Sequence, residues 1–101
     1  MKTSNPLFNK EKLQKAIQVL DALDNPFREK LMRFMQNHPV STVSTIIKGV
    51  KKVQSFVSKH LRILRLSNLI SNKKIGKEVF YSINQAKIDD TNRSIDMLVK
   101  S

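Results

Sequence analysis

The 101-residue sequence predicts a mainly α-helical fold with one small β-hairpin. Apolar residues recur at helical spacing in five separate segments. Between the fourth and fifth segments, two β-rich runs flank a tip of lysine and glycine at residues 73–77. The chain has only two glycines and three prolines, which argues against a linker, so we expect a single domain over residues 1–101.

The predicted fold begins with two helices separated by Asn25 and Pro26. Residues 1–9 have the character of a flexible arm, and a first helix is predicted over residues 10–24. The apolar stripe of this helix is Leu13, Ile17 and Leu20. Asn25 is a favoured helix cap, and Pro26 suits the first helical position, where no N–H is needed. The second helix should end at His38, because the residue before a proline avoids the helical region.

A short third helix and a longer fourth helix should follow. Ser41 or Thr42 can cap the third helix. Its inward face is predicted to be Val43, Ile46, Ile47 and Val50. The fourth helix is predicted over residues 53–67, and it ends before Asn68, a residue type that tolerates the left-handed conformation of many helix ends.

The last two predicted elements are the hairpin and the fifth helix. The hairpin should span residues 69–83 and turn at its lysine- and glycine-rich tip. The fifth helix is predicted over residues 86–100. Its apolar stripe is Ile88, Ile95 and Leu98. The predicted order is therefore four helices, the hairpin and one more helix.

The positive charge of the chain is confined to its middle. The net charge is +11, and the segment from Lys30 to Lys77 carries eleven lysines and arginines with no aspartate or glutamate. The flanking segments carry eight basic and eight acidic residues and are neutral together. This pattern predicts a surface for a polyanion, whose binding should weaken steeply as salt rises.

The fourth helix has a polar side without any acid. This side consists of Gln54, Ser55, Ser58, Lys59, Arg62 and Arg65. Glutamine can pair with adenine, serine can contact several base edges, and lysine or arginine favour guanine or phosphate. A helix that enters the major groove by its N-terminal end would present the first four of these side chains to the bases. Taken alone, the pattern fits an ordinary solvated helix face equally well.

A short helix, a turn, a cationic helix and a basic hairpin together form a winged helix-turn-helix pattern. From Leu20 to about Ile83 the sequence resembles the ArsR family of bacterial transcriptional repressors. Three segments carry the resemblance, in order and with family-like spacing: LDNPFR at residues 23–28, QSFVSKHLRIL at 54–64, and the predicted hairpin. They resemble that family's opening of the second helix, its recognition helix and its wing.

The resemblance implies a homodimer that binds double-stranded DNA, and we expect the protein to act in the cytoplasm. The positions matching the family's base-reading residues are Gln54, Ser55, Ser58 and Lys59. The expected backbone contacts are Lys48, Lys51, Lys52, Arg62 and Arg65, with Lys73, Lys74 and Lys77 in the wing. We assign the two terminal apolar stripes to the dimer interface, because a small domain would struggle to cover both alone. The interface residues are then Leu13, Ile17, Leu20, Ile88, Ile95 and Leu98.

A two-fold dimer predicts a DNA site with an inverted repeat, read by recognition helices roughly 34 Å apart. The expected action is repression by occluding a promoter. One departure from the family concerns the turn before Gln54. Lys51, Lys52 and Val53 stand where the family usually has a Gly-Leu-Ser-like run, and Gly49 lies two residues earlier. The two lysines should strengthen the contact with phosphates that does not depend on base sequence.

Several functions are disfavoured by what the sequence lacks. The chain has no cysteine, so thiolate metal sites and disulfides are excluded. Asp89, Asp90 and Asp96 occur in the predicted last helix without a histidine, so we expect neither a metal site nor a cofactor. His60 falls on the apolar side of its helix and is predicted to be a core or backbone-bonded histidine. No arrangement of nucleophile, base and acid is apparent, which indicates a binding protein and not an enzyme.

Two other functions remain open at the level of sequence. The same basic face could serve an architectural or RNA-binding protein that does not read bases. It could also dock an acidic protein partner. A membrane role is weaker, because the cationic helix uses its apolar side for the core and no run is long enough to span a bilayer. The sequence does not indicate an effector.

Overall fold

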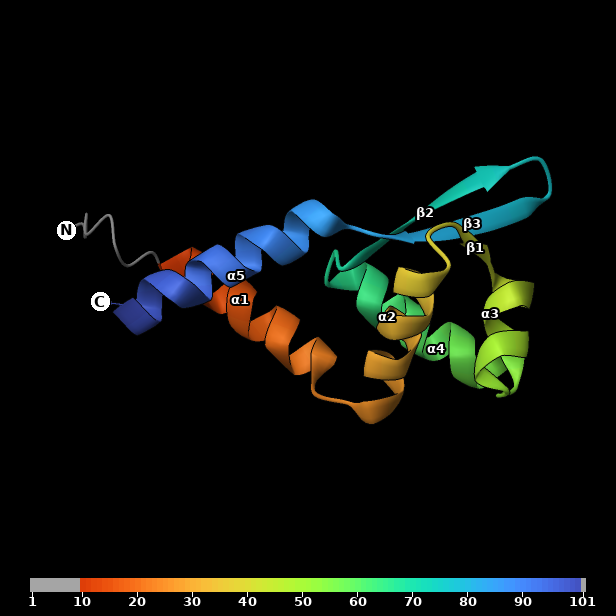
Figure 1. Ribbon diagram of the computed structural model, residues 1–101, viewed down its shortest axis with the longest axis horizontal. Coiled ribbons are helices and arrows are strands. Elements are labelled where there is room, and N and C mark those ends of the chain that lie inside the picture. Colours follow the sequence, from red (N-terminus) through yellow and green to blue (C-terminus); the bar gives the residue numbers. More distant parts are fainter. Residues whose placement is uncertain (1–9, 101) are drawn as a thin grey trace.

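The structure, a computed structural model, describes residues 10–100 and confirms the predicted fold class (Figure 1). The elements are α1 (Lys10–Leu23), α2 (Pro26–Asn37), β1 (Ser41–Thr42), α3 (Val43–Val50), α4 (Gln54–Leu66), β2 (Ile70–Ile75), β3 (Glu78–Ile83) and α5 (Gln85–Lys100). The bounds agree with the predicted ones to within one or two residues. The arm expected over residues 1–9 lies outside the described residues.

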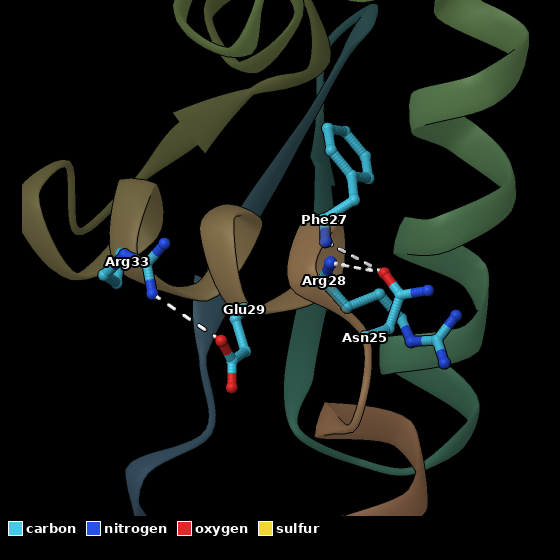
Figure 2. Close-up of polar contacts among 5 residues, drawn as sticks. All are labelled: Asn25, Phe27, Arg28, Glu29 and Arg33. Carbon is cyan, nitrogen blue, oxygen red and sulfur yellow. Dashed lines mark hydrogen bonds and ion pairs between the residues drawn. The ribbon is translucent and has the colours of Figure 1, made fainter.

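The corner between α1 and α2 forms as Asn25 and Pro26 predict. The side-chain Oδ1 of Asn25 accepts hydrogen bonds from the backbone N–H groups of Phe27 and Arg28, both at 3.0 Å (Figure 2). Pro26 occupies the first helical position. At the other end, α2 stops at Asn37, and the backbone of His38 is no longer helical. Both ends of α2 are therefore set by local chemistry that is readable in the sequence.

The sheet has one strand more than the predicted hairpin. The two-residue strand β1 pairs with β3, so that the antiparallel order is β1-β3-β2 with Ser41 opposite Tyr81. A two-residue strand has no periodicity to detect, and the sequence predicts only a helix cap at these residues. Thr42 belongs to the strand and also caps α3, because its Oγ1 accepts a hydrogen bond from the N–H of Thr45 at 3.2 Å.

The apolar core lies where α1 to α4 meet the base of the wing formed by β2 and β3. The largest side chains at its centre are Leu31, Met35, Ile46, Leu61, Leu64, Leu69 and Ile70, each at most 2% exposed. α4 ends at this core: Asn68 has a left-handed φ of 62°, and the N–H of Leu69 donates to the carbonyl of Leu64 at 3.0 Å. The predicted left-handed end of the fourth helix is confirmed.

α5 lies alongside α1 at one end of an elongated molecule, and α3, α4 and the wing lie toward the other end (Figure 1). Ala16 of α1 and Thr91 of α5 are buried. Asn84 starts α5, since its Oδ1 accepts a hydrogen bond from the N–H of Lys87 at 3.2 Å. None of the described helices combines the length and the apolar character needed to cross a bilayer.

Candidate nucleic-acid interface

The turn between α3 and α4 forms without a glycine. Lys51 takes the left-handed conformation, with φ 57° and ψ 45°, and its N–H donates to the carbonyl of Ile47 at 2.9 Å. This is the hydrogen bond of a left-handed helix cap, a position that usually holds glycine because a Cβ raises its energy. Lys51 therefore takes the left-handed position that a turn glycine would usually occupy, and its Cβ lowers the local stability.

Gly49 has a different role from a turn glycine. A Cβ built on Gly49 would lie 2.0 Å from Cε1 of Phe34, far inside van der Waals contact. The residue lets α3 approach the ring of Phe34 in α2. Its place in the sequence is therefore explained by helix packing.

The first residue before α4 is an exposed valine. Val53 is the N-cap residue and makes no side-chain cap hydrogen bond, and 69% of its surface is exposed. A valine at this position leaves the first N–H groups of the helix without the acceptor that serine or asparagine would supply. The N-terminal end of α4 thus lacks a side-chain cap from Val53.

α4 buries one face and exposes the other. Val57, Leu61 and Leu64 are at most 1% exposed and fix the inner face of the helix on the core. The four predicted base-reading residues, Gln54, Ser55, Ser58 and Lys59, are all exposed. The first turns of α4 therefore present an amide, two hydroxyls and an ammonium together, a set of groups that can hydrogen-bond to base edges.

The wing carries exposed lysines at its far end. Gly76, with φ 64°, is the first of the two loop residues between the paired Ile75 and Glu78, and glycine is favoured at such a turn. Lys73 and Lys74 lie on β2, and Lys77 lies in the turn; all three are exposed. The wing extends away from the helical body (Figure 1). Its tip is therefore a small cationic projection.

The cations predicted to contact the DNA backbone lie on α3, α4, the turn between them and the wing, where the one acid is the exposed Glu78 at the start of β3. All eight are exposed: Lys48, Lys51, Lys52, Arg62, Arg65, Lys73, Lys74 and Lys77. Two ion pairs of the described chain, Glu29–Arg33 at 3.9 Å and Asp90–Arg93 at 3.7 Å, involve none of them. Because α3, α4 and β2 contain no carboxylate, no like-charged group of these elements opposes a phosphate.

His60 is a core histidine, as predicted, but its hydrogen-bond partner is a side chain and not the backbone. Its exposed fraction is 7%, and Nδ1 lies 3.1 Å from Nη1 of Arg28. Burial, then the charges of Arg28 and Lys59, lower the pKa of His60 below its ordinary value. Phe56, one helical turn before His60, keeps 39% of its surface exposed while its ring contacts that of His60. Sequence reasoning did not find Arg28, which lies 32 residues away from its partner.

The residues predicted for a dimer interface lie on α1 and α5. In the single chain Ile17 is 54% exposed, Leu20 48% and Leu98 38%. Leu13, Ile88 and Ile95 are half-buried, and Ile88 packs against the core. Part of each stripe is thus used within one chain, and the exposed part remains available for a partner.

The acids of α5 make local contacts. Oδ1 of Asp89 accepts a hydrogen bond from Nε2 of Gln85 at 3.0 Å, and Asp90 pairs with Arg93. Between residues 10 and 100, no three residues of the types His, Cys, Asp and Glu gather as a metal ion would require.

The helix pair α3–α4, its turn and the adjoining wing define a winged helix-turn-helix protein. Residues 25–72 match the family described as "Bacterial regulatory protein, arsR family". The chain is 34% identical over 77 residues to the transcriptional repressor PagR of Bacillus anthracis, a match that covers 76% of this chain and 77% of that protein. The chain therefore belongs to the arsR family, as its sequence pattern predicted.

Other similar proteins agree with this assignment. An uncharacterized HTH-type transcriptional regulator of Methanocaldococcus jannaschii is 28% identical over 88 residues, 87% of this chain and 99% of that protein. The crystal structure of PagR superposes with a TM-score of 0.73 at 27% identity, covering 83% of this chain and 98% of that chain. An ArsR-like regulator from Rhodococcus sp. RHA1 gives a TM-score of 0.82 at 19% identity over 89% and 84% of the two chains, a likeness of fold alone. The chain is a DNA-binding transcriptional regulator, a class without enzymatic activity.

Proposed function

We propose that this protein is a homodimeric repressor that binds an inverted repeat in double-stranded DNA and blocks a promoter in the cytoplasm. The observation that carries the proposal is the exposed, acid-free face of α4, with its hydrogen-bonding groups gathered in the first turns of the helix. The similarity to PagR, which is named a transcriptional repressor, supports repression over activation. Occlusion needs no chemistry, which agrees with a non-enzymatic class.

We divide the proposed contacts into readers and grips. Gln54, Ser55, Ser58 and Lys59 are the readers, because their short or amide-bearing side chains lie where α4 would enter the major groove. The eight exposed cations described above are the grips, which hold phosphates and carry no sequence information. Loss of a reader should therefore lower specificity, whereas loss of a grip should lower affinity for every sequence.

The dimer would use the apolar surface that α1 and α5 leave exposed. Ile17 and Leu20 of α1 and Leu98 of α5 offer large exposed apolar side chains, and the two helices lie side by side away from the wing (Figure 1). An isologous contact through this surface would relate two copies of α4 by a two-fold axis. That symmetry leads to the inverted repeat.

Selection of duplexes from a random DNA pool at physiological salt tests this function directly. We expect enrichment of an inverted repeat, with half-site centres roughly 34 Å apart. Gln54→Ala should then weaken binding to the enriched site by about 1–3 kcal/mol and relax one position of it. The matched variant Lys74→Ala should weaken binding to enriched and random duplexes about equally and flatten the salt dependence.

An architectural or RNA-binding protein is the second candidate. The observation that favours it is the turn, where exposed Lys51 and Lys52 add sequence-independent charge directly before the reading helix. Binding that fades with salt and enriches no motif, with a preference for structured RNA, would replace the first proposal by this one. Retention of an acidic protein partner without DNA binding at physiological salt would indicate a protein-interaction module instead.

A further inference from the structure

Arg28 links three elements of the fold. Its backbone N–H is held by the cap residue Asn25 at the start of α2, and its Nε donates to the carbonyl of Ala22 in α1. Its Nη1 donates to Nδ1 of His60 in α4, at 3.1 Å. Figure 2 shows the side chain leaving α2 and extending toward α4. One half-buried guanidinium therefore ties the α1–α2 corner to the middle of the recognition helix.

The ring of His60 is enclosed by two phenylalanines. The centroids of Phe56 and His60 are 4.7 Å apart, those of Phe27 and His60 5.2 Å, and those of Phe27 and Phe56 4.7 Å. Apolar packing on the core fixes which face of α4 is buried, but apolar contacts have no preferred direction and set the fine rotation of the helix less sharply than a directional bond does. A hydrogen bond to a fixed guanidinium is directional and removes that freedom.

We propose that Arg28 is a positioning residue that sets the rotation of α4 through His60, and thereby the aim of the base-reading side chains. His60 and the reader Lys59 are adjacent in the helix, so a rotation that moves the ring moves the reader equally. The proposal rests on the base-reading role proposed for α4. The proposal goes beyond base reading, because it gives Arg28 and His60 a role that involves no contact with DNA.

The charges around His60 make this link dependent on its protonation. Arg28 can only donate, so Nδ1 must be unprotonated to accept, and the ring proton of neutral His60 then lies on Nε2. The charged groups that lower the pKa of His60 are Arg28 from α2 and Lys59 from its own helix. The acids of the same corner do not compensate, because Asp24 is exposed and Glu29 pairs with Arg33. A protonated His60 would face two cations and lose its bond to Arg28.

Amide hydrogen exchange of the free protein is the first test. Arg28→Ala should speed exchange in the first two turns of α4 on the order of tenfold relative to the amides of β2 and β3. Arg33→Ala is the matched control, because it removes the same charge from an exposed side chain of the same helix. Equal exchange in the two variants would overturn the proposal. This test needs no operator, so it decides the positioning role even when the proposed base-reading function fails.

Binding to a selected inverted repeat and to a random duplex is the second test. Arg28→Ala should lose on the order of tenfold in affinity for the selected site, about the effect of one good base contact, and should keep its affinity for random DNA. A uniform loss on both duplexes, with a flatter salt dependence, would make Arg28 a phosphate contact and overturn the proposal.

A pair of variants at His60 keeps the proposal testable when Arg28→Ala does not fold. His60→Asn retains an oxygen close to the position of Nδ1, so it should preserve the link, whereas His60→Leu should lose preference for the selected site. In the wild-type protein that preference should fall only as the pH drops below about 6.5, the ordinary histidine pKa, because burial and then the charges of Arg28 and Lys59 lower the pKa of His60, and protonation breaks the bond to Arg28. His60→Asn should abolish this pH dependence. A pH profile unchanged by His60→Asn would contradict the proposal.

Discussion

The two helices joined by Arg28 and His60 begin in opposite ways. α2 starts at a cap residue that accepts two backbone N–H bonds, followed by a proline in the first helical position. α4 starts at Val53, an exposed valine with no cap bond, two residues after a lysine in the left-handed conformation. The start of α2 has a cap bond, a proline and an acidic residue in its first turn, and the start of α4 has none of these.

The difference corresponds to what each helix end does. The start of α2 is part of the scaffold, where Asn25 and Arg28 bond to groups of α1 and α2. The start of α4 is the end proposed to enter the major groove, and natural proteins break local rules mainly at functional sites. In the proposed function, residues 51–53 lie where the protein meets DNA, which agrees with a helix start that is not optimised for folding stability.

The largest loss of stability is expected for a substitution of Gly49, where α3 packs against α2 of the scaffold. Gly49→Ala should lower the free energy of unfolding by about 1–3 kcal/mol, because its Cβ would overlap the ring of Phe34. Urea unfolding followed by circular dichroism measures this loss. The double variant Gly49→Ala with Phe34→Leu should recover part of it. An unchanged stability of Gly49→Ala would contradict the close approach of α3 and α2.

The cap of α2 should give the next largest effect. Asn25→Ala removes the acceptor of two N–H bonds and should lower the free energy of unfolding by about 1 kcal/mol. Asn25→Asp keeps an acceptor oxygen and should change little. Thermal unfolding of the three proteins at one salt concentration separates these cases. Equal loss in both variants would mean that the cap bond is not what Asn25 contributes.

At the start of α4, by contrast, a substitution that adds a cap should increase the stability. Val53→Ser supplies the missing cap acceptor and should raise the free energy of unfolding by up to about 1 kcal/mol. Val53→Ala, which adds no acceptor, serves as the control and should not gain. Binding to the selected DNA site should be measured alongside stability, because we expect the stabilised variant to bind no better than the wild type. A loss of stability in Val53→Ser would remove the contrast between the two helix starts.

The smallest change in the free energy of unfolding is expected at Lys51. Lys51→Gly relieves the left-handed Cβ, and after the greater flexibility of glycine in the unfolded chain is subtracted we expect a gain of about 0.5 kcal/mol. It also removes one grip, so the slope of log affinity against log salt should fall by about 0.9. Lys52→Gln should reproduce the change of slope without the gain in stability. If both variants gained equally, the backbone of Lys51 would not be strained.

Much of the fold could be predicted because its signals are local and periodic. The helix stripes, Asn25 before Pro26, the left-handed Asn68 and the lysine- and glycine-rich tip each depend on residues close together in the chain. The strand β1 could not be predicted, because its pairing partner lies about forty residues away and two residues have no period.

The candidate site was readable in part for the same reason. The four readers and eight grips follow from the polar face of one helix and from runs of lysine, and all are exposed in the structure. The link between Arg28 and His60 joins residues 32 positions apart, and nothing periodic connects them. The left-handed conformation of Lys51 was equally hidden, because lysine carries no local signal for it.

Among residues 10–100, the strand order β1-β3-β2 places β2 at an edge of the sheet, with one side of its backbone unpaired along the wing. An open strand of this kind can pair with the same strand of another molecule and so begin aggregation. Lys73 and Lys74 lie on this strand, and charged side chains are a common protection for such edges. The lysines proposed to hold DNA thus also disfavour pairing of this edge with another molecule. Replacing both lysines with apolar residues would remove this protection. The substitutions that the wing can accept are therefore limited by its open edge as well as by DNA.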